Sequence, residues 1–392
     1  MQSKLYYIVL CVLLASCSGH VVSVKNPNEG KLTATHQLVA SGEKKFLLDT
    51  ETAQKPTYIQ LVRDSSETLM LTFLNTYKNA IYFYDYSTTS YIGNIGYQKE
   101  GPNAILALTG YYIKNMDSIY VYNMPLTEIV LTDSVGQVKR RTSLRGDDRS
   151  NWSRYYPQYV LNTAIPLIEN RGKLMLTGMS PFSISDSLIN KFCFATYLDT
   201  KTNQVEFRHT YPEALYGRNS NWEGGMHTQA YFAISSNDEL IYSFPVSHDL
   251  YIQKDDQESY TTVYGGSNVA GTIHSINWDP KTTPEEVIVE SAVRGDMYGP
   301  ILFDPYRNVY YRILLQGIPD ATARTPLEKK PVIVIMMDEH FNYLGETTIG
   351  RWEEWNWMNS FVTEEGLSME YTGEQDFDED YLRLKIFTVE KL

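Results

Sequence analysis

The chain has 392 residues, a formal net charge of −13 and 31 tyrosines among its aromatic residues. So acidic a protein is not expected to bind nucleic acid, whose phosphates would repel it, or to be recruited to anionic lipid through a basic patch. Its length suggests two or three domains unless a repeat unites them, and its many tyrosines favour half-buried strands.

The first twenty residues, MQSKLYYIVLCVLLASCSGH, have the pattern of an export signal. Lys4 precedes an apolar run over Tyr6–Leu14, which is about half the length that spans a bilayer. The letters LASC, ending at Cys17, resemble a bacterial lipobox, in which the cysteine is acylated and the chain is cut before it. We therefore expect lipidation at Cys17, and an ordinary cleaved signal with a chance cysteine is the alternative.

This interpretation divides the chain into three parts. Residues 1–16 are expected to be a lipoprotein signal peptide, residues 17–30 a lipidated tether and residues 31–392 a single folded domain. The mature chain then keeps Cys193 as its one remaining cysteine, so no intramolecular disulfide can form and the core alone has to hold the fold.

A strand–turn–strand pattern recurs six times after the tether. In each copy a strand ends in a polar turn such as RDSSE, ENRGK or SSNDE, and two further β-rich strands follow. Such units are typical of a β-propeller, because one blade cannot cover its own faces and needs neighbours. The sequence therefore predicts an all-β, six-bladed propeller. The first apolar residues of the second strands, spaced 50, 55, 66, 69 and 58 residues apart, are Leu69, Ile119, Leu174, Leu240, Val309 and Leu367.

The sixth copy ends after its third strand, at YLRLKIFTVEKL, so its outer strand has to come from elsewhere. The segments LTATHQLVA and KKFLLD, near the N-terminus, are spare strand-like stretches. We expect one of them, with Lys44–Asp49 preferred, to close the ring in the last blade and so remove an exposed sheet edge. Helix is expected to be scarce, and TTPEEVIVESAV is compatible with a strand after a proline-started turn.

The lipobox, the six copies and the linker GNIGYQKEGPNAI together resemble the TolB-like six-bladed β-propeller lipoproteins of unknown function found in Bacteroidetes. The most specific piece is Gly96–Ala104, similar to a linker that these propellers place between an outer strand and the next inner strand. The stretch YGPILFDPYRNVYYRI is similar to a tyrosine-rich blade start. These motifs are architectural, so the resemblance implies a fold and no catalytic residues.

The resemblance also bears on location. Surface-exported lipoproteins of that group usually carry acidic residues soon after the lipidated cysteine, whereas this tether reads SGHVVSVKNPNEG. We therefore expect an outer-membrane lipoprotein that faces the periplasm rather than the cell surface.

Local catalytic motifs are missing from the sequence, which has no Gly-x-Ser-x-Gly, His-Glu-x-x-His, phosphate loop or Cys-x-x-Cys, and no cofactor is expected. The long linkers between blades are the better candidates, because they are rich in arginine forks and aromatic faces that bind anions and rings. Packing between blades is the alternative role for any one of these side chains. The candidate ligand-binding residues are Trp152, Arg154, Arg218, Trp222, His227, Arg294, Asp296, Tyr298, Arg351 and Trp355.

Two function classes follow. The first is a noncatalytic propeller, anchored in the membrane through Cys17, that binds a protein, peptide or glycan of the envelope. The second is a periplasmic hydrolase or lyase that uses a metal in the propeller channel. For that second class His227, His274 and Asp296 are the least unsuitable ligands, although no metal site is predicted.

Overall fold

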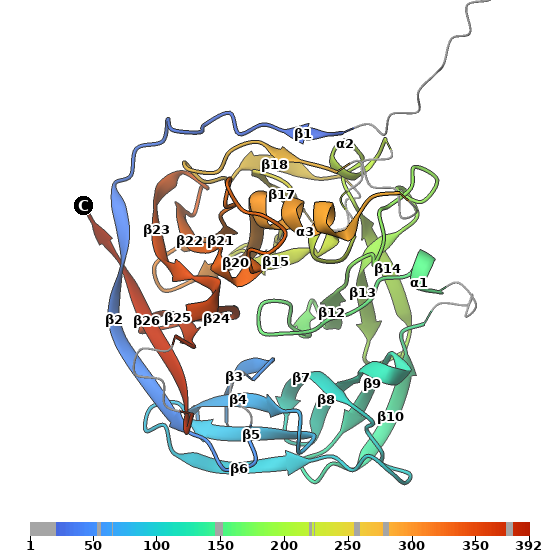
Figure 1. Ribbon diagram of the computed structural model, residues 1–392. Coiled ribbons are helices and arrows are strands. Elements are labelled where there is room, and N and C mark those ends of the chain that lie inside the picture. Colours follow the sequence, from blue (N-terminus) through green and yellow to red (C-terminus); the bar gives the residue numbers. More distant parts are fainter. Residues whose placement is uncertain are drawn as a thin grey trace, which may run out of the picture.

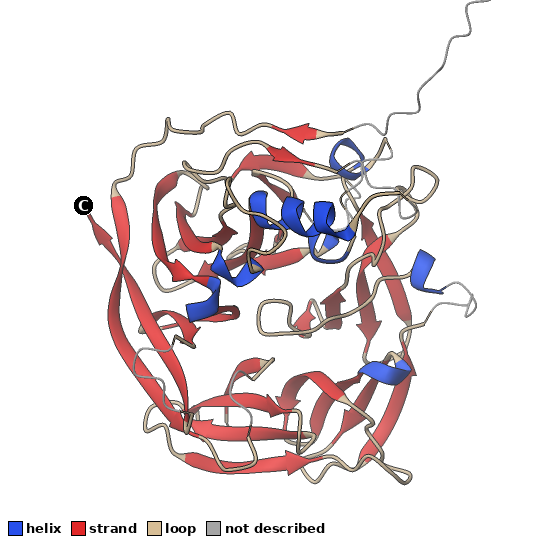
Figure 2. Cartoon of the chain, in the orientation of Figure 1, coloured by secondary structure: helices blue, strands red, loops and turns tan. Residues whose placement is uncertain are grey.

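In the computed structural model, six antiparallel four-stranded sheets surround a common centre (Figure 1). The structure describes residues 21–52, 56–64, 66–145, 152–218, 222, 224–254, 259–276, 282–373 and 379–392. Strands dominate the regular structure and helices are short (Figure 2). The predicted all-β, six-bladed propeller is confirmed.

Consecutive strands build the first three blades, each running from the centre to the rim (Figure 1). Blade 1 contains β3 (Ile59–Arg63), β4 (Leu69–Asn75), β5 (Ala80–Asp85) and β6 (Tyr91–Gly96). Blade 2 contains β7 (Leu108–Asn115), β8 (Ser118–Asn123), β9 (Glu128–Thr132) and β10 (Val138–Ser143). Blade 3 contains β11 (Ile168–Asn170), β12 (Lys173–Thr177), β13 (Cys193–Asp199) and β14 (Val205–Thr210).

Blades 4 and 5 are also built from consecutive strands, whereas blade 6 takes its outer strand from the N-terminal part of the chain. Blade 4 contains β15 (Tyr231–Ile234), β16 (Leu240–Ser243), β17 (Asp249–Gln253) and β18 (Thr261–Tyr264). Blade 5 contains β20 (Met297–Asp304), β21 (Val309–Leu315), β22 (Pro331–Asp338) and β23 (Tyr343–Arg351). Blade 6 contains β24 (Trp355–Thr363), β25 (Gly366–Tyr371), β26 (Tyr381–Lys391) and, as its outer strand, β2 (His36–Leu47). Every second strand begins at the predicted apolar residue or one residue before it.

Ring closure by an N-terminal strand is confirmed. β2 pairs with β26 from His36 opposite Lys391 to Leu47 opposite Tyr381, with one irregularity between Ala40 and Gly42. Both spare segments expected from the sequence therefore contribute to one long strand. Its inward side chains include Phe46, which is fully buried, so the strand also completes the core.

The described part of the expected tether, residues 21–30, lies against the ring. β1 (Ser23–Val24) pairs with β19 (Ile273–His274), in the linker after blade 4. The buried side chain of Asn26 donates to the carbonyls of Ser267 and Ala270 at 2.8 and 2.7 Å. This stretch is thus fixed to the propeller, whereas the predicted signal peptide and Cys17 lie outside the described residues.

Helices occur mainly in the linkers between blades. Most of the stretch TTPEEVIVESAV belongs to the helix α3 (Glu285–Arg294), so the strand considered for it is wrong. Glu285 and Glu286 lie in its first turn, where acidic side chains stabilise a helix. The other helical segments are α1 (Trp152–Tyr155), α2 (Glu213–Tyr216) and the short 3₁₀ turns η1 (Met124–Leu126), η2 (Gly225–Thr228), η3 (Leu327–Lys329) and η4 (Trp352–Glu354). Among the residues described, no helix is long and apolar enough to cross a membrane.

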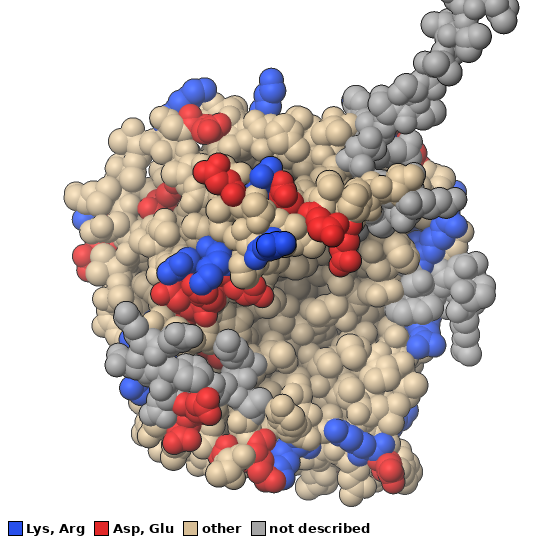
Figure 3. All heavy atoms as spheres, in the orientation of Figure 1, with Lys and Arg blue, Asp and Glu red and all other residues tan. Residues whose placement is uncertain are grey.

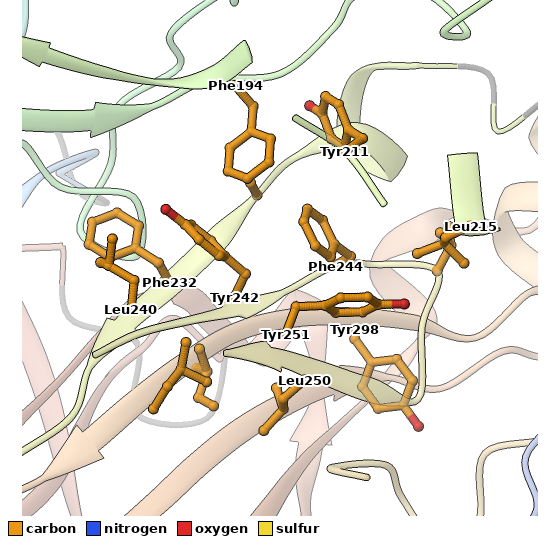
Figure 4. Packing of buried hydrophobic residues seen from close by; sticks show 14 of the residues in the cluster. Phe194, Tyr211, Leu215, Phe232, Leu240, Tyr242, Phe244, Leu250, Tyr251 and Tyr298 are labelled. Carbon is orange, nitrogen blue, oxygen red and sulfur yellow. The ribbon is translucent and has the colours of Figure 1, made fainter. Parts of the chain in front are cut away.

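Aromatic side chains fill the space between neighbouring blades. Phe194 of blade 3 lies edge-to-face against Tyr242 and Phe244 of blade 4, with ring centroids 5.0 and 5.6 Å apart (Figure 4). Edge-to-face pairs of this kind add to the stabilisation that comes from burying their area. Phe46 of β2 likewise contacts Tyr84 and Tyr86 of blade 1, so several tyrosines pack blade against blade.

A buried arginine joins blades 4 and 5. Arg312 on β21 has no exposed surface, and all five of its N–H groups donate to neutral oxygens of blade 4 and its loops. Its guanidinium also lies over the ring of Tyr298, 3.9 Å from the centroid. Burial lowers the pKa of Arg312 to about 10, so the side chain stays charged at neutral pH.

Candidate functional site

The predicted linkers share one face of the propeller. Each follows the last strand of one blade and leads to the first strand of the next, so topology places all of them at the same end of the strands. Figure 3 views the molecule from the side that carries α3 and shows acidic and basic side chains gathered beside a hollow at the middle of the ring. We call this side the linker face.

Three of the predicted residues are packed into the interior. Tyr298 is fully buried, and its hydroxyl lies 2.8 Å from Nδ1 of His248 and accepts the Ser267 N–H at 3.0 Å. Trp222 donates its indole N–H to the Leu215 carbonyl at 2.9 Å. Trp355 packs on Tyr371 and Phe387 in blade 6. These side chains hold linkers and blades together.

Asp296 connects two loops of the linker face. Its carboxylate accepts the N–H of Gly271 at 2.8 Å and the N–H of Gly317 at 2.7 Å. Nearby, the fully buried Lys330 donates to the carbonyls of Ala292 and Gly295 at 3.0 and 2.5 Å, at the C-terminal end of α3. Burial lowers the pKa of Lys330 to about 8, against the opposing effect of Asp296.

The three residues considered as metal ligands line one small hollow. His227, His274 and Asp296 surround a space of about 20 Å³ together with Trp222, which is room for about one water molecule. Burial, followed by the charge of Lys330, lowers the pKa of His227 to about 4, and Nδ1 of His274 lies 2.9 Å from the Ser23 hydroxyl. Within the described ranges, no three His, Cys, Asp or Glu side chains are grouped to hold a metal ion.

The predicted arginines lie at the surface, and each has different contact partners. Arg154 lines a pocket of about 330 Å³ with Phe182 and several serines, and Arg218 is exposed just after α2. Arg294 donates to the Ala321 carbonyl and pairs with Glu290 at 2.8 Å. Arg351 pairs with Glu353 at 3.4 Å. The structure describes the backbone of Trp152 at the start of α1 but not its side chain.

A pocket that the sequence analysis did not select lies between blades 3 and 4. Two of its residues, Arg171 and Asp238, belong to the turns between the first and second strands of these blades, so it opens at the end of the strands opposite to the linker face. Its volume is about 220 Å³. We call it the blade 3–4 pocket, and it is lined by Asn170, Arg171, Lys173, Tyr197, Arg208, His209, Asp238, Leu240 and Gln253.

One sequence signal for this pocket was present. The turn ENRGK carries two cations, whereas the corresponding turns SSNDE and TEEG carry acidic residues. Which side chains of blade 4 lie beside the turn ENRGK depends on how the blades pack in the ring, and the sequence alone does not give this packing.

Fold and surface together define a six-bladed β-propeller with no assigned chemistry, and the comparisons with known proteins agree. Residues 35–348 match the domain of unknown function DUF4221, and the chain belongs to that family. A crystal structure of a DUF4221 member from Bacteroides vulgatus is similar, with a TM-score of 0.76 at 18% identity, covering 91% of this chain and 99% of that one. A comparison with curated proteins found no match.

A second solved structure shares the fold more distantly. It is a candidate exported protein from Bacteroides fragilis, with a TM-score of 0.53 at 9% identity, covering 91% of this chain and 95% of that one. The expected resemblance is thus confirmed for the six-bladed propeller and for a family of unknown function, while the TolB-like and lipoprotein assignments stay predictions.

Proposed function

We propose that this chain is a lipid-anchored propeller of the cell envelope that binds a protein, peptide or glycan without transforming it. The lipobox-like LASC sequence and the exported neighbour from Bacteroides fragilis support the location. We place the protein in the outer membrane on the periplasmic side, as the tether sequence favours.

The observation that carries the noncatalytic role is the state of Asp296 and Lys330. They are an acid and a base of the kind that catalysis uses, and they lie in the linker and loop around the end of α3. Both oxygens of Asp296 accept backbone N–H groups, and Lys330 donates to two carbonyls at the end of α3. A group in such a role cannot exchange protons with a substrate without giving up contacts that hold the loops. These residues therefore serve the scaffold that presents the binding surfaces.

Mass spectrometry of a bound ligand tests this role directly. The purified protein is incubated with peptide and polysaccharide fractions of the envelope, washed, and the retained material is compared with the starting material. We expect the retained ligand to have an unchanged mass and to be present at no more than one equivalent per protein. Products formed at several equivalents per protein would contradict the proposal, and their loss on chelation would favour the metal-dependent hydrolase or lyase.

A separate experiment tests the anchor. In cells labelled with a tagged fatty acid, the wild-type chain should carry label and sediment with outer membranes, whereas Cys17→Ala should carry none because the acyl acceptor is gone. A Cys193→Ala chain is the matched control and should behave as wild type. Label on the Cys17→Ala chain would refute lipidation at this position.

A further inference from the structure

We propose that the blade 3–4 pocket binds a small acidic sugar, such as a hexuronic acid, through the amide of Gln253 and the paired cations Lys173 and Arg208. The inference rests on the proposed binding function and names the ligand class. It concerns residues at the opposite end of the strands from the linker face, none of which was selected from the sequence.

The amide of Gln253 supplies the first argument. This side chain, at the end of β17, is only 2% exposed, lines the pocket, and its Oε1 has no hydrogen-bond partner among the described residues. Buried polar atoms without a partner are rare in native proteins, so this one calls for a partner that enters the pocket. A hydroxyl group fits in either orientation of the amide, because it both donates and accepts.

The charges supply the second argument. Lys173 donates to Oε1 of Glu206 at 2.9 Å, and Arg208 donates to Oε2 of the same carboxylate at 2.6 and 3.0 Å. The hydrogen bond from Lys173, followed by that from Arg208, lowers the pKa of Glu206, so this carboxylate and its two cations remain ionised at neutral pH. One carboxylate thus fixes two cations at the pocket wall, where they attract an anion to an otherwise acidic protein.

The shape and the aromatic wall agree with a single sugar ring. The volume of about 220 Å³ lies below the range of about 300–1,000 Å³ for pockets that take drug-sized ligands. Tyr197 and His209 line one side with ring centroids 5.7 Å apart, and such amphipathic rings contact sugars well. His209 has a φ of 62°, a left-handed conformation that is uncommon outside glycine, and its Nδ1 lies 2.7 Å from the Tyr242 hydroxyl.

Calorimetric titration with four probes tests the proposal: glucuronate, galacturonate, glucose and inorganic phosphate. We expect at least one uronate to bind, and to bind at least tenfold more tightly than glucose, because only a uronate has a carboxylate that can pair with Lys173 and Arg208. Gln253→Leu and Lys173→Met should each weaken uronate binding by about tenfold or more, as expected for one hydrogen bond to a ligand.

Lys114→Met is the matched control, since Lys114 makes a carboxylate pair of the same length, 2.9 Å to Glu169, and does not line the pocket. This variant should bind as wild type. The free Gln253→Leu protein should be at least as stable as wild type, because the change removes a buried acceptor without a partner. A clear loss of its melting temperature would show that Gln253 has a structural partner instead.

The remaining outcomes decide the inference. No binding by either uronate, equal binding of glucose, or phosphate binding that Gln253→Leu leaves unchanged would each overturn it. If envelope glycans are retained but the pocket variants retain them equally, the inference fails and the proposed function stands. If uronate binds in the pocket and is converted, the site stands and the noncatalytic role fails.

Discussion

Replacing Arg312 by methionine tests whether blades 4 and 5 depend on one buried cation. Methionine keeps the length and apolar character of the stem but removes all five donors. Two of the carbonyls that lose a donor, those of Phe244 and His248, still accept a backbone N–H. For the carbonyls of Ser247 and Gly265 the guanidinium is the only donor among the described residues.

The expected loss of stability in Arg312→Met depends mainly on the two carbonyls that keep no other donor within the described part of the chain. Each buried carbonyl left without a donor costs about 1–3 kcal/mol, and the lost contact with the Tyr298 ring adds about 0.5–2 kcal/mol. Relief from burying a charge offsets part of the sum. We therefore expect the free energy of unfolding to fall by about 3–5 kcal/mol, which lies in the upper range for single substitutions.

Urea unfolding followed by tryptophan fluorescence measures this loss. Arg324→Met is the control, because Arg324 is exposed and its replacement should change the stability by less than about 0.5 kcal/mol. The loss of stability in Arg312→Lys should lie between those of Arg324→Met and Arg312→Met, since lysine keeps the charge but has three donors in place of five. A loss below about 1 kcal/mol in Arg312→Met would refute the account of Arg312 as a joint between blades.

Three further predictions concern stability. Deleting residues 21–49 should lower the melting temperature far more than deleting residues 21–30, because only the longer deletion removes β2 and bares the edge of β26; equal melting temperatures would contradict the role of β2. Burial, helped by the charge of Arg312, lowers the pKa of His248 to about 4, so the unfolded state binds the extra proton and His248 alone should lower the stability by about 3 kcal/mol as the pH drops from 6.5 to 4. A His248→Gln protein should therefore lose about that much less than wild type over the same pH range, and His227, whose pKa burial also lowers to about 4, should account for a similar further loss in both proteins. Lys330→Met should destabilise by about 2–4 kcal/mol, since two carbonyls at the end of α3 lose their donor. Lys329→Met breaks one partly exposed pair with Glu353 and should cost less than about 1 kcal/mol; similar denaturation midpoints for the two variants would show that Lys330 does not cap the helix.

The sequence predicted the fold because a propeller repeats its own pattern. Six polar turns and six apolar strand starts marked the blades, and the missing strand of the last copy pointed to the N-terminus. The helix α3 was missed because Val287, Ile288 and Val289 favour a strand locally. Its C-terminal end is capped by Lys330, a residue 36 positions beyond Arg294, and no local pattern shows such a contact.

The candidate site was less predictable for a related reason. Residue type alone marked Tyr298 and Trp355 as ring-binding candidates, yet burial commits both to packing. Whether an aromatic side chain faces a ligand or another blade depends on where neighbouring blades meet. The blade 3–4 pocket illustrates the same limit, since Lys173 and Gln253 come from different blades, 80 positions apart.

The pairing of β2 with β26 turns the chain into a noncovalent circle. Blades 1–5 are each made from a contiguous stretch and can form in order during synthesis, but blade 6 has to wait until the last strand is available. Closure is therefore the final step of assembly. Once the circle exists, a single proteolytic cut in a loop elsewhere should leave every blade in place, whereas a cut within β2 would break the pairing with β26 that closes the ring.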